Sequence, residues 1–174
     1  MDQYPDSIVD LAMARQVYEC NWVPSRVTED QLNNLVKTGA LSEKNVIHWR
    51  VPGTECPPTP QEGEVIVFAD HLSRGFNPPG SKFFRDVLAN FELRPQEIGP
   101  NSVTNICHFQ VFSEVYLQEE PSVELFRDCF HLNCRTKFKD GPNKELGGMA
   151  IQKRKEVTFP HANLHSHPKE WNHT

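Results

Sequence analysis

Large apolar side chains in the middle of the chain constrain its fold more than any other feature of the sequence. Five of them follow at spacings i, i+1, i+4, i+5 and i+8, and they are Phe83, Phe84, Val87, Leu88 and Phe91. This spacing places all five on one face of an α-helix, and other elements must cover that face. Ser81 suits the N-cap of this helix and Pro95 stops it. The pattern therefore predicts a helical core.

Two further helices are predicted after it. Gly99 and Pro100 open a helix with apolar side chains nearly all round, which we expect to be the buried central helix. These side chains are Val103, Ile106, Cys107, Phe109, Val111, Phe112, Val115, Tyr116 and Leu117. The inner stripe of the next helix is Val123, Phe126 and Phe130. We expect one core that contains Phe83, Phe84, Leu88, Ile106, Phe109, Phe126 and Phe130.

The last third of the chain favours strands and turns. Residues 135–139 alternate in polarity, residues 140–143 form a turn signal, and residues 149–153 and 156–159 are further candidate strands. The predicted fold class is therefore α+β: a mainly helical core from about residue 64 to 131, with a small antiparallel β-sheet in the C-terminal third. We expect few helices to hold residues 149–174, so this part should open more readily than residues 81–130.

Residues 1–60 are interpreted as an N-terminal accessory segment that ends in a proline-rich linker. Thr28 and Gln31 form a capping box for a short helix, and Gly39 suits its C-terminal end. Residues 45–51 alternate like a strand. Residues 52–60 are rich in proline and predict a stiff, extended connector. The predicted division is thus 1–60 and 61–174.

Charge is unevenly spread along the chain. The net charge is −5, yet residues 121–174 carry more basic than acidic side chains, whereas residues 61–120 are acidic. A site for anions should therefore lie in the last third. Its predicted residues, which would bind nucleic acid weakly and without sequence preference, are Arg135, Lys137, Lys139, Lys153, Arg154 and Lys155. The alternative is a solvated strand face.

Histidines and cysteines offer only weak signs of a metal site. His161, His165, His167 and His173 cluster near the C-terminal end, but Pro160 and Pro168 disrupt the helix that a zinc-binding i, i+4 pair would need. An exposed polar tail is the favoured interpretation. Cys129, His131 and Cys134 lack the spacing of a four-ligand zinc site, and we expect buried, reduced cysteines instead. We expect no metal and no cofactor.

Other patterns exclude several classes of protein. The longest apolar run, residues 65–69, is too short to span a bilayer, and the N-terminal residues lack the pattern of a secretory signal. Five cysteines without a CxxC pair fit a reducing compartment. We therefore expect a soluble intracellular protein, cytoplasmic or nuclear, with no membrane partner. No nucleotide-binding, hydrolase or metalloprotease motif is present, and no carboxylates stand out as a two-metal nuclease site.

Residues 67–171 resemble the plant domain family called "putative gypsy-type transposase". The motifs that carry the resemblance are Phe68-Ala69-Asp70-His71-Leu72-Ser73-Arg74-Gly75-Phe76 with the following prolines, Phe83-Phe84-Arg85-Asp86-Val87-Leu88, Gly99-Pro100-Asn101-Ser102-Val103, Tyr116-Leu117-Gln118-Glu119-Glu120-Pro121, Leu125-Phe126-Arg127, Gly147-Gly148-Met149-Ala150-Ile151-Gln152-Lys153-Arg154 and Lys169-Glu170-Trp171. The resemblance implies an origin in a Ty3/gypsy-like retroelement of a plant genome. It supplies no catalytic residue. Family members usually continue past this tryptophan into a further aromatic strand, which predicts that residues 61–174 are a C-terminally incomplete domain.

Two hypotheses of function follow. The first is a non-catalytic, retrotransposon-derived interaction module, Gag-like or associated with nucleic acid, whose partners are nucleic acid or other proteins of the element. The second is a metal-dependent DNA strand-transfer protein, which would bring several carboxylates to one pocket. The missing catalytic motifs and the basic C-terminal third favour the first hypothesis.

Overall fold

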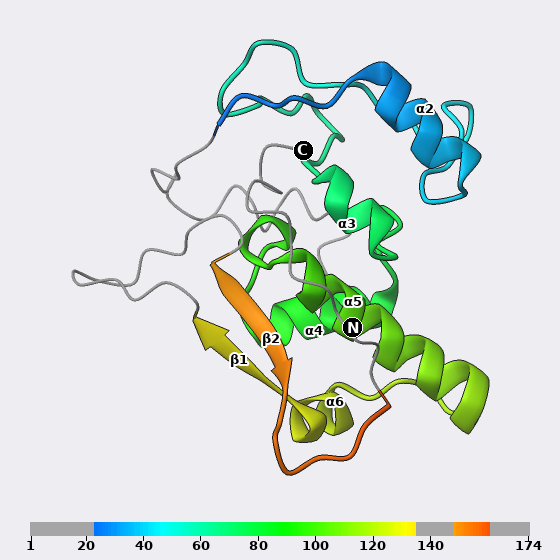
Figure 1. The fold of residues 1–174 in the computed structure, drawn as a ribbon, viewed down its shortest axis with the longest axis vertical. Coiled ribbons are helices and arrows are strands. Elements are labelled where there is room, and N and C mark those ends of the chain that lie inside the picture. Colours follow the sequence, from blue (N-terminus) through cyan, green and yellow to red (C-terminus); the bar gives the residue numbers. More distant parts are fainter. Residues whose placement is uncertain (1–22, 135–147, 161–174) are drawn as a thin grey trace, which may run out of the picture.

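A computed structural model describes residues 23–134 and 148–160, and Figure 1 shows their arrangement. The elements in chain order are α2 (Glu29–Lys37), α3 (Ala69–Ser73), α4 (Lys82–Asn90), the 3₁₀ helix η1 (Pro95–Glu97), α5 (Pro100–Val111), the π-helical η2 (Phe112–Leu117), α6 (Val123–Cys129), β1 (Phe130–Cys134) and β2 (Met149–Lys153). α5 contacts α3, α4 and β2, while α6 contacts α4 and β1. The fold is α+β, with helices around α5 and a two-stranded antiparallel sheet, as predicted.

Hydroxyl side chains begin three of the helices. Thr28 and Gln31 form the predicted capping box at α2, because the Thr28 hydroxyl accepts from the Gln31 amide and the Gln31 side chain accepts from the Thr28 amide. Ser81 and Ser122 cap α4 and α6 in the same way, each accepting from the amide three residues on. These bonds satisfy amides that a helix leaves without partners, so local sequence sets where the helices start.

The predicted core is confirmed. Phe83, Phe84, Leu88, Ile106, Phe109, Phe126 and Phe130 are all buried in one cluster. Phe109 lies at its centre: its ring centroid is 5.6 Å from that of Phe83, 5.2 Å from that of Phe126 and 6.2 Å from that of Phe130. Phe159 completes the cluster, with its ring 5.6 Å from that of Phe109. Stacked and edge-on ring pairs of this kind stabilise a core beyond simple area burial.

The sheet differs from the predicted one in two respects. α6 ends at Cys129 and Phe130 begins β1, so Phe130 reaches the core from a strand and not from a helix. β2 has the predicted residues, and it pairs with β1 so that Phe130 lies opposite Lys153 and Cys134 opposite Met149. The predicted third strand at residues 156–159 is wrong, because this segment turns and brings Phe159 back onto the core. The candidate strand at residues 135–139 lies outside the described residues.

α5 covers the edge of β2 that faces away from β1. The Gly99 amide donates to the Met149 carbonyl (3.1 Å), and the Ile151 amide donates to the Ser102 hydroxyl (2.9 Å). The Asn105 side chain donates to the Ile151 carbonyl (2.9 Å). Gly99, Ser102 and Asn105 are spaced three residues apart at the start of α5. Their hydrogen bonds to β2 thus take the place of those that a third strand would make. These bonds cover the outer edge of β2, so this edge is not left for pairing with other chains. The faster opening of residues 149–174 stays a prediction.

Ser102→Ala tests this edge. Ser102 is buried, so the variant leaves the Ile151 amide without an acceptor, and we expect the free energy of unfolding to fall by about 1–3 kcal/mol. Urea denaturation measures this loss, and amide hydrogen exchange should be faster at Ile151. Ser73→Ala is the matched control: the hydroxyl of this exposed serine donates to the Ala69 carbonyl of its own helix, and its loss should change stability by less than about 0.5 kcal/mol. Equal stability of the two variants would contradict the edge contact.

The described N-terminal residues pack on the same core. Leu32 and Leu41 belong to the buried cluster that also contains Leu72 of α3. Residues 45–51 form no strand, and the Trp49 indole instead donates to the Ser42 carbonyl. The proline-rich segment is a closed loop and not an extended connector, because the Arg50 guanidinium binds both carboxylate oxygens of Glu64, at 2.9 and 2.8 Å. The division at residue 60 stays a prediction.

Candidate interaction surface

The basic residues predicted to bind nucleic acid are only partly within the described chain. Lys153 ends β2, and Arg154 and Lys155 follow it. Arg135, Lys137 and Lys139 lie outside the described residues. The chain leaves β1 at Cys134, which pairs with Met149 at the end of the sheet opposite Lys153. The described strands therefore do not by themselves bring the two basic groups together, and nucleic-acid binding by these six residues stays a prediction.

Of the three predicted binding residues that the structure describes, two donate hydrogen bonds to the protein's own backbone. The Lys153 ammonium donates to the carbonyls of Val157 (2.6 Å) and Arg154 (3.3 Å), and so closes the turn that leads to Phe159. The Arg154 guanidinium donates to the Arg127 carbonyl at 3.0 Å. Lys153 and Arg154 are half-buried, whereas Lys155 is exposed. A structural role thus accounts for Lys153 and Arg154, while the exposed Lys155 faces solvent.

The cysteines and histidines in the described part do not form a metal site. No three His, Cys, Asp or Glu side chains within residues 23–134 and 148–160 are placed to hold an ion, and the four clustered C-terminal histidines lie outside these ranges. Cys107 is half-buried on α5, where its thiol donates to the Gly75 carbonyl, and burial raises its pKa to about 11. Burial and the nearby Asp128 also raise the pKa of Cys129. Both thiols are therefore protonated at neutral pH and unsuited to nucleophilic chemistry.

Buried polar groups connect α3 to the start of α5. His71 is 1% exposed, and its Nε2 lies 3.1 Å from the Ile98 carbonyl, to which it donates. Burial lowers the pKa of His71 to about 4, although the bond to Ile98 acts in the opposite direction. Nearby, the buried Glu97 carboxylate accepts from the Arg94 amide (2.6 Å) and contacts the Arg94 guanidinium. The neutral, solvent-excluded imidazole thus holds structure and is not accessible to a substrate.

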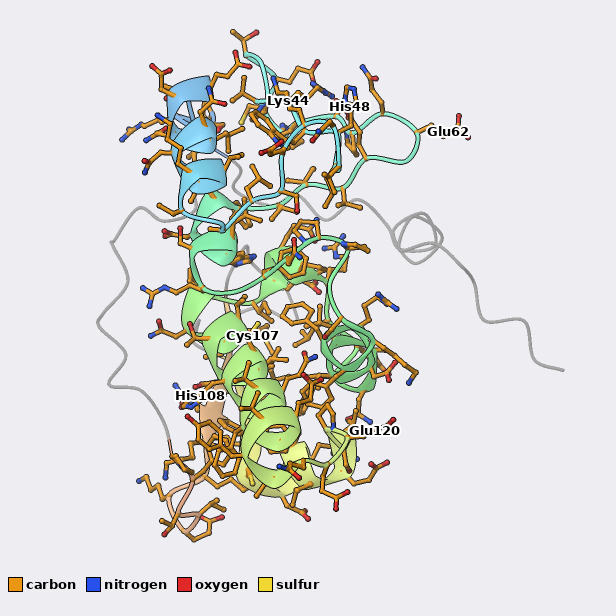
Figure 2. The ribbon with its side chains drawn as sticks, turned by 90° about the vertical axis from the view of Figure 1, so that its right-hand side faces the viewer. Lys44, His48, Glu62, Cys107, His108 and Glu120 are labelled. Atoms are coloured by element: carbon orange, nitrogen blue, oxygen red, sulfur yellow. The ribbon has the colours of Figure 1, made fainter. Side chains whose placement is uncertain are left out.

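The last turns of the long helix expose apolar side chains. Val111 is 49% exposed, Val115 62%, Tyr116 74% and Leu117 48%. Three exposed carboxylates lie among and beside them, those of Glu114, Glu119 and Glu120. We call these seven residues the acidic-apolar surface. In Figure 1 the yellow-green end of the α5–η2 helix projects to the lower right, away from α4, α6 and the two strands. Figure 2 shows Glu120 in the turn after it, with Cys107 and His108 further back along α5.

The prediction that this helix is buried all along its length is wrong for its second half. Ile106 and Phe109 are buried, but after Val111 the helix continues as a π-helix whose Val115, Tyr116 and Leu117 side chains are exposed. The Glu119 amide donates to the Ser113 carbonyl and Gln118 adopts a left-handed conformation, which ends the helix. π-helical segments are rare and often mark functional sites. The glutamates among the apolar residues were the sequence signal that this end faces solvent.

Residues 65–134, which run from before α3 to the end of β1, match the model of a family described as "Putative gypsy type transposon". The match covers less than half of the chain. No curated protein and no solved structure matches the chain.

Within the described residues, no helix is both long enough and apolar enough to cross a membrane. Plant origin and a missing C-terminal strand stay predictions. The segment from α3 to β1, which carries the acidic-apolar surface, is thus similar to the putative gypsy type transposon family.

Proposed function

We propose that residues 65–134 act as a non-catalytic module of a gypsy-type element, and that the module binds another protein through the acidic-apolar surface. The exposure of Val111, Val115, Tyr116 and Leu117 within two turns of one helix carries this proposal. Exposed apolar side chains are ordinary when scattered singly, but a contiguous group rimmed by polar residues is typical of an interaction site. The family match supports the setting, a protein of a mobile element.

A strand-transfer enzyme is the competing function. Such an enzyme needs several carboxylates that converge on one or two metal ions. Two acidic residues of the described helices are used differently. Asp86 pairs with Lys82 at 2.6 Å on an exposed face of α4. Glu97 is buried against Arg94. Both contacts favour structural roles for these carboxylates and support a module that binds and does not cleave.

A cleavage assay tests the non-catalytic part of the proposal. Purified protein is incubated with labelled double- and single-stranded DNA and with Mg²⁺ or Mn²⁺, and we expect the DNA to stay intact. The matched samples contain Asp70→Asn, Asp86→Asn or Asp128→Asn protein. Metal-dependent cleavage that disappears in one of these variants would show that the chain is an enzyme and would overturn the proposal.

A further inference from the structure

The acidic-apolar surface combines two chemistries that together specify its occupant. Resting on the proposed function, we infer that this surface binds an amphipathic α-helix of another protein, with an apolar stripe bordered by lysine and arginine. The inference rests on three features of the surface: the row of apolar side chains, the carboxylates beside them and the helical backbone that presents both.

The backbone of the surface decides the secondary structure of the occupant. Val111 and Val115 are four residues apart on one helix, so their side chains are neighbours on its surface, and Tyr116 and Leu117 extend the apolar area. A helix offers no row of unpaired strand amides and carbonyls, so an extended peptide finds no edge to pair with, as it would on a sheet. Side-chain rows on a helix instead fit the grooves of a second helix. An apolar helix stripe is therefore the matching surface.

The charges of the surface decide the polarity of the occupant's borders. Glu114, Glu119 and Glu120 are exposed, and residues 111–120 contain no lysine or arginine. The Glu114 carboxylate accepts from the Gln110 side chain at 2.8 Å, which orients it on the helix surface. Carboxylates around an apolar patch attract cationic side chains and repel anionic ones, and this complementarity selects partners and speeds their association. Lysine and arginine at the borders of the bound helix meet this requirement.

The same charges argue against other occupants. In a symmetric dimer of this chain the patch would meet itself, so Glu114, Glu119 and Glu120 of both copies would lie in one interface. Like charges placed together across an interface are unfavourable. Nucleic acid and anionic lipid surfaces carry negative phosphates, which these carboxylates repel. A basic helix of a different protein avoids all three conflicts.

Three synthetic peptides of equal length test the inference. The first has leucine at i, i+3, i+4 and i+7 positions and lysine at the flanking positions. The second keeps the leucines and replaces every lysine with glutamate. The third keeps the lysines and replaces the leucines with serine. Fluorescence anisotropy measures the binding of each to the full chain, and we expect measurable binding of the first peptide only, weakening as salt concentration rises.

Charge-reversed protein shows whether the first peptide binds at the inferred place. Glu119→Lys/Glu120→Lys should weaken its binding about fivefold or more, because two attractions at the border become repulsions. Glu43→Lys/Glu62→Lys changes the net charge equally at two exposed residues elsewhere, and it should change binding less than twofold. Figure 2 shows Glu62 at the end of the molecule opposite Glu120. Tyr116→Ser should also weaken binding while lowering the thermal midpoint of unfolding only slightly, since this side chain is exposed and stacks on the Phe112 ring alone among the described rings.

Each remaining outcome has a defined meaning. Equal binding of the leucine–glutamate peptide would overturn the basic helix as occupant while the proposed binding function stands. If Glu119→Lys/Glu120→Lys and Glu43→Lys/Glu62→Lys weaken binding of the first peptide equally, the inferred binding place is overturned as well. The peptide would then be attracted by the net charge of the protein and not by this surface. Concentration-dependent dimerisation in sedimentation, lost in Tyr116→Ser, would identify a second copy as the occupant. Failure of all three peptides together with a monomer in sedimentation would overturn both the inference and the proposed surface.

Discussion

Phe109→Ala will lower the free energy of unfolding by about 3–5 kcal/mol. Phe109 is 2% exposed, and its ring contacts those of Phe83, Phe126, Phe130 and Phe159. Removing the ring takes away apolar burial and leaves a cavity that four surrounding rings cannot easily close. Since domains of this size are stable by about 5–15 kcal/mol, the variant should be close to unfolding at room temperature. Urea denaturation followed by circular dichroism measures the loss.

Tyr116→Ala is the matched control for this prediction. It removes an aromatic ring from the continuation of the same helix, but Tyr116 is 74% exposed. Its loss should change the free energy of unfolding by less than about 0.5 kcal/mol. A Phe109→Ala protein as stable as the Tyr116→Ala protein would show that the core has been misplaced.

Acidification from pH 7 to pH 4 will destabilise the protein by about 3 kcal/mol through His71 alone. In the unfolded chain this imidazole titrates near 6.5, whereas in the folded protein burial lowers its pKa to about 4. Below 6.5 the unfolded chain therefore takes up a proton that the folded protein does not accept. The resulting loss of stability begins as the pH falls through 6.5 and is complete below about 4. Denaturation in urea at a series of pH values measures it.

His71→Gln separates this effect from the titration of carboxylates. Glutamine places an amide N–H near the position of the Nε2 that donates to the Ile98 carbonyl, and it does not titrate. The difference in stability between the wild-type protein and this variant should shrink by about 3 kcal/mol between pH 7 and pH 4. Parallel pH curves for the two proteins would mean that His71 is protonated or exposed in the folded state.

Patterns within a few residues predicted the helices and their core well. Thr28 and Ser81 cap helices at the expected places, and the phenylalanine spacing around Phe83 identified a buried face. Alternation of polarity was a weaker guide. It found β2 but also predicted strands at residues 45–51 and 156–159, which do not form. A strand needs a partner with matching register, and alternation in one segment carries no information about that partner.

The candidate surface could not be predicted for a related reason. Hydrophobicity all round α5 and its continuation predicted burial, yet Ile106 is buried and Val115 is exposed. Both side chains are apolar and both lie on one continuous helix. Burial depends on whether another element packs against a residue. Only the packing of α4, α6 and the strands decides which part of the α5–η2 helix is buried.

Local sequence was thus enough to establish where helices begin and which side chains seek the core, because capping bonds and helical periodicity act over three to four residues. The contacts that hold these pieces together were decided by the tertiary structure. Ser102 and Ile151 are 49 residues apart, and His71 and Ile98 are 27 apart. A hydrogen bond between such residues exists only after the core has brought them within 3 Å or so, and nothing in either local sequence encodes that meeting.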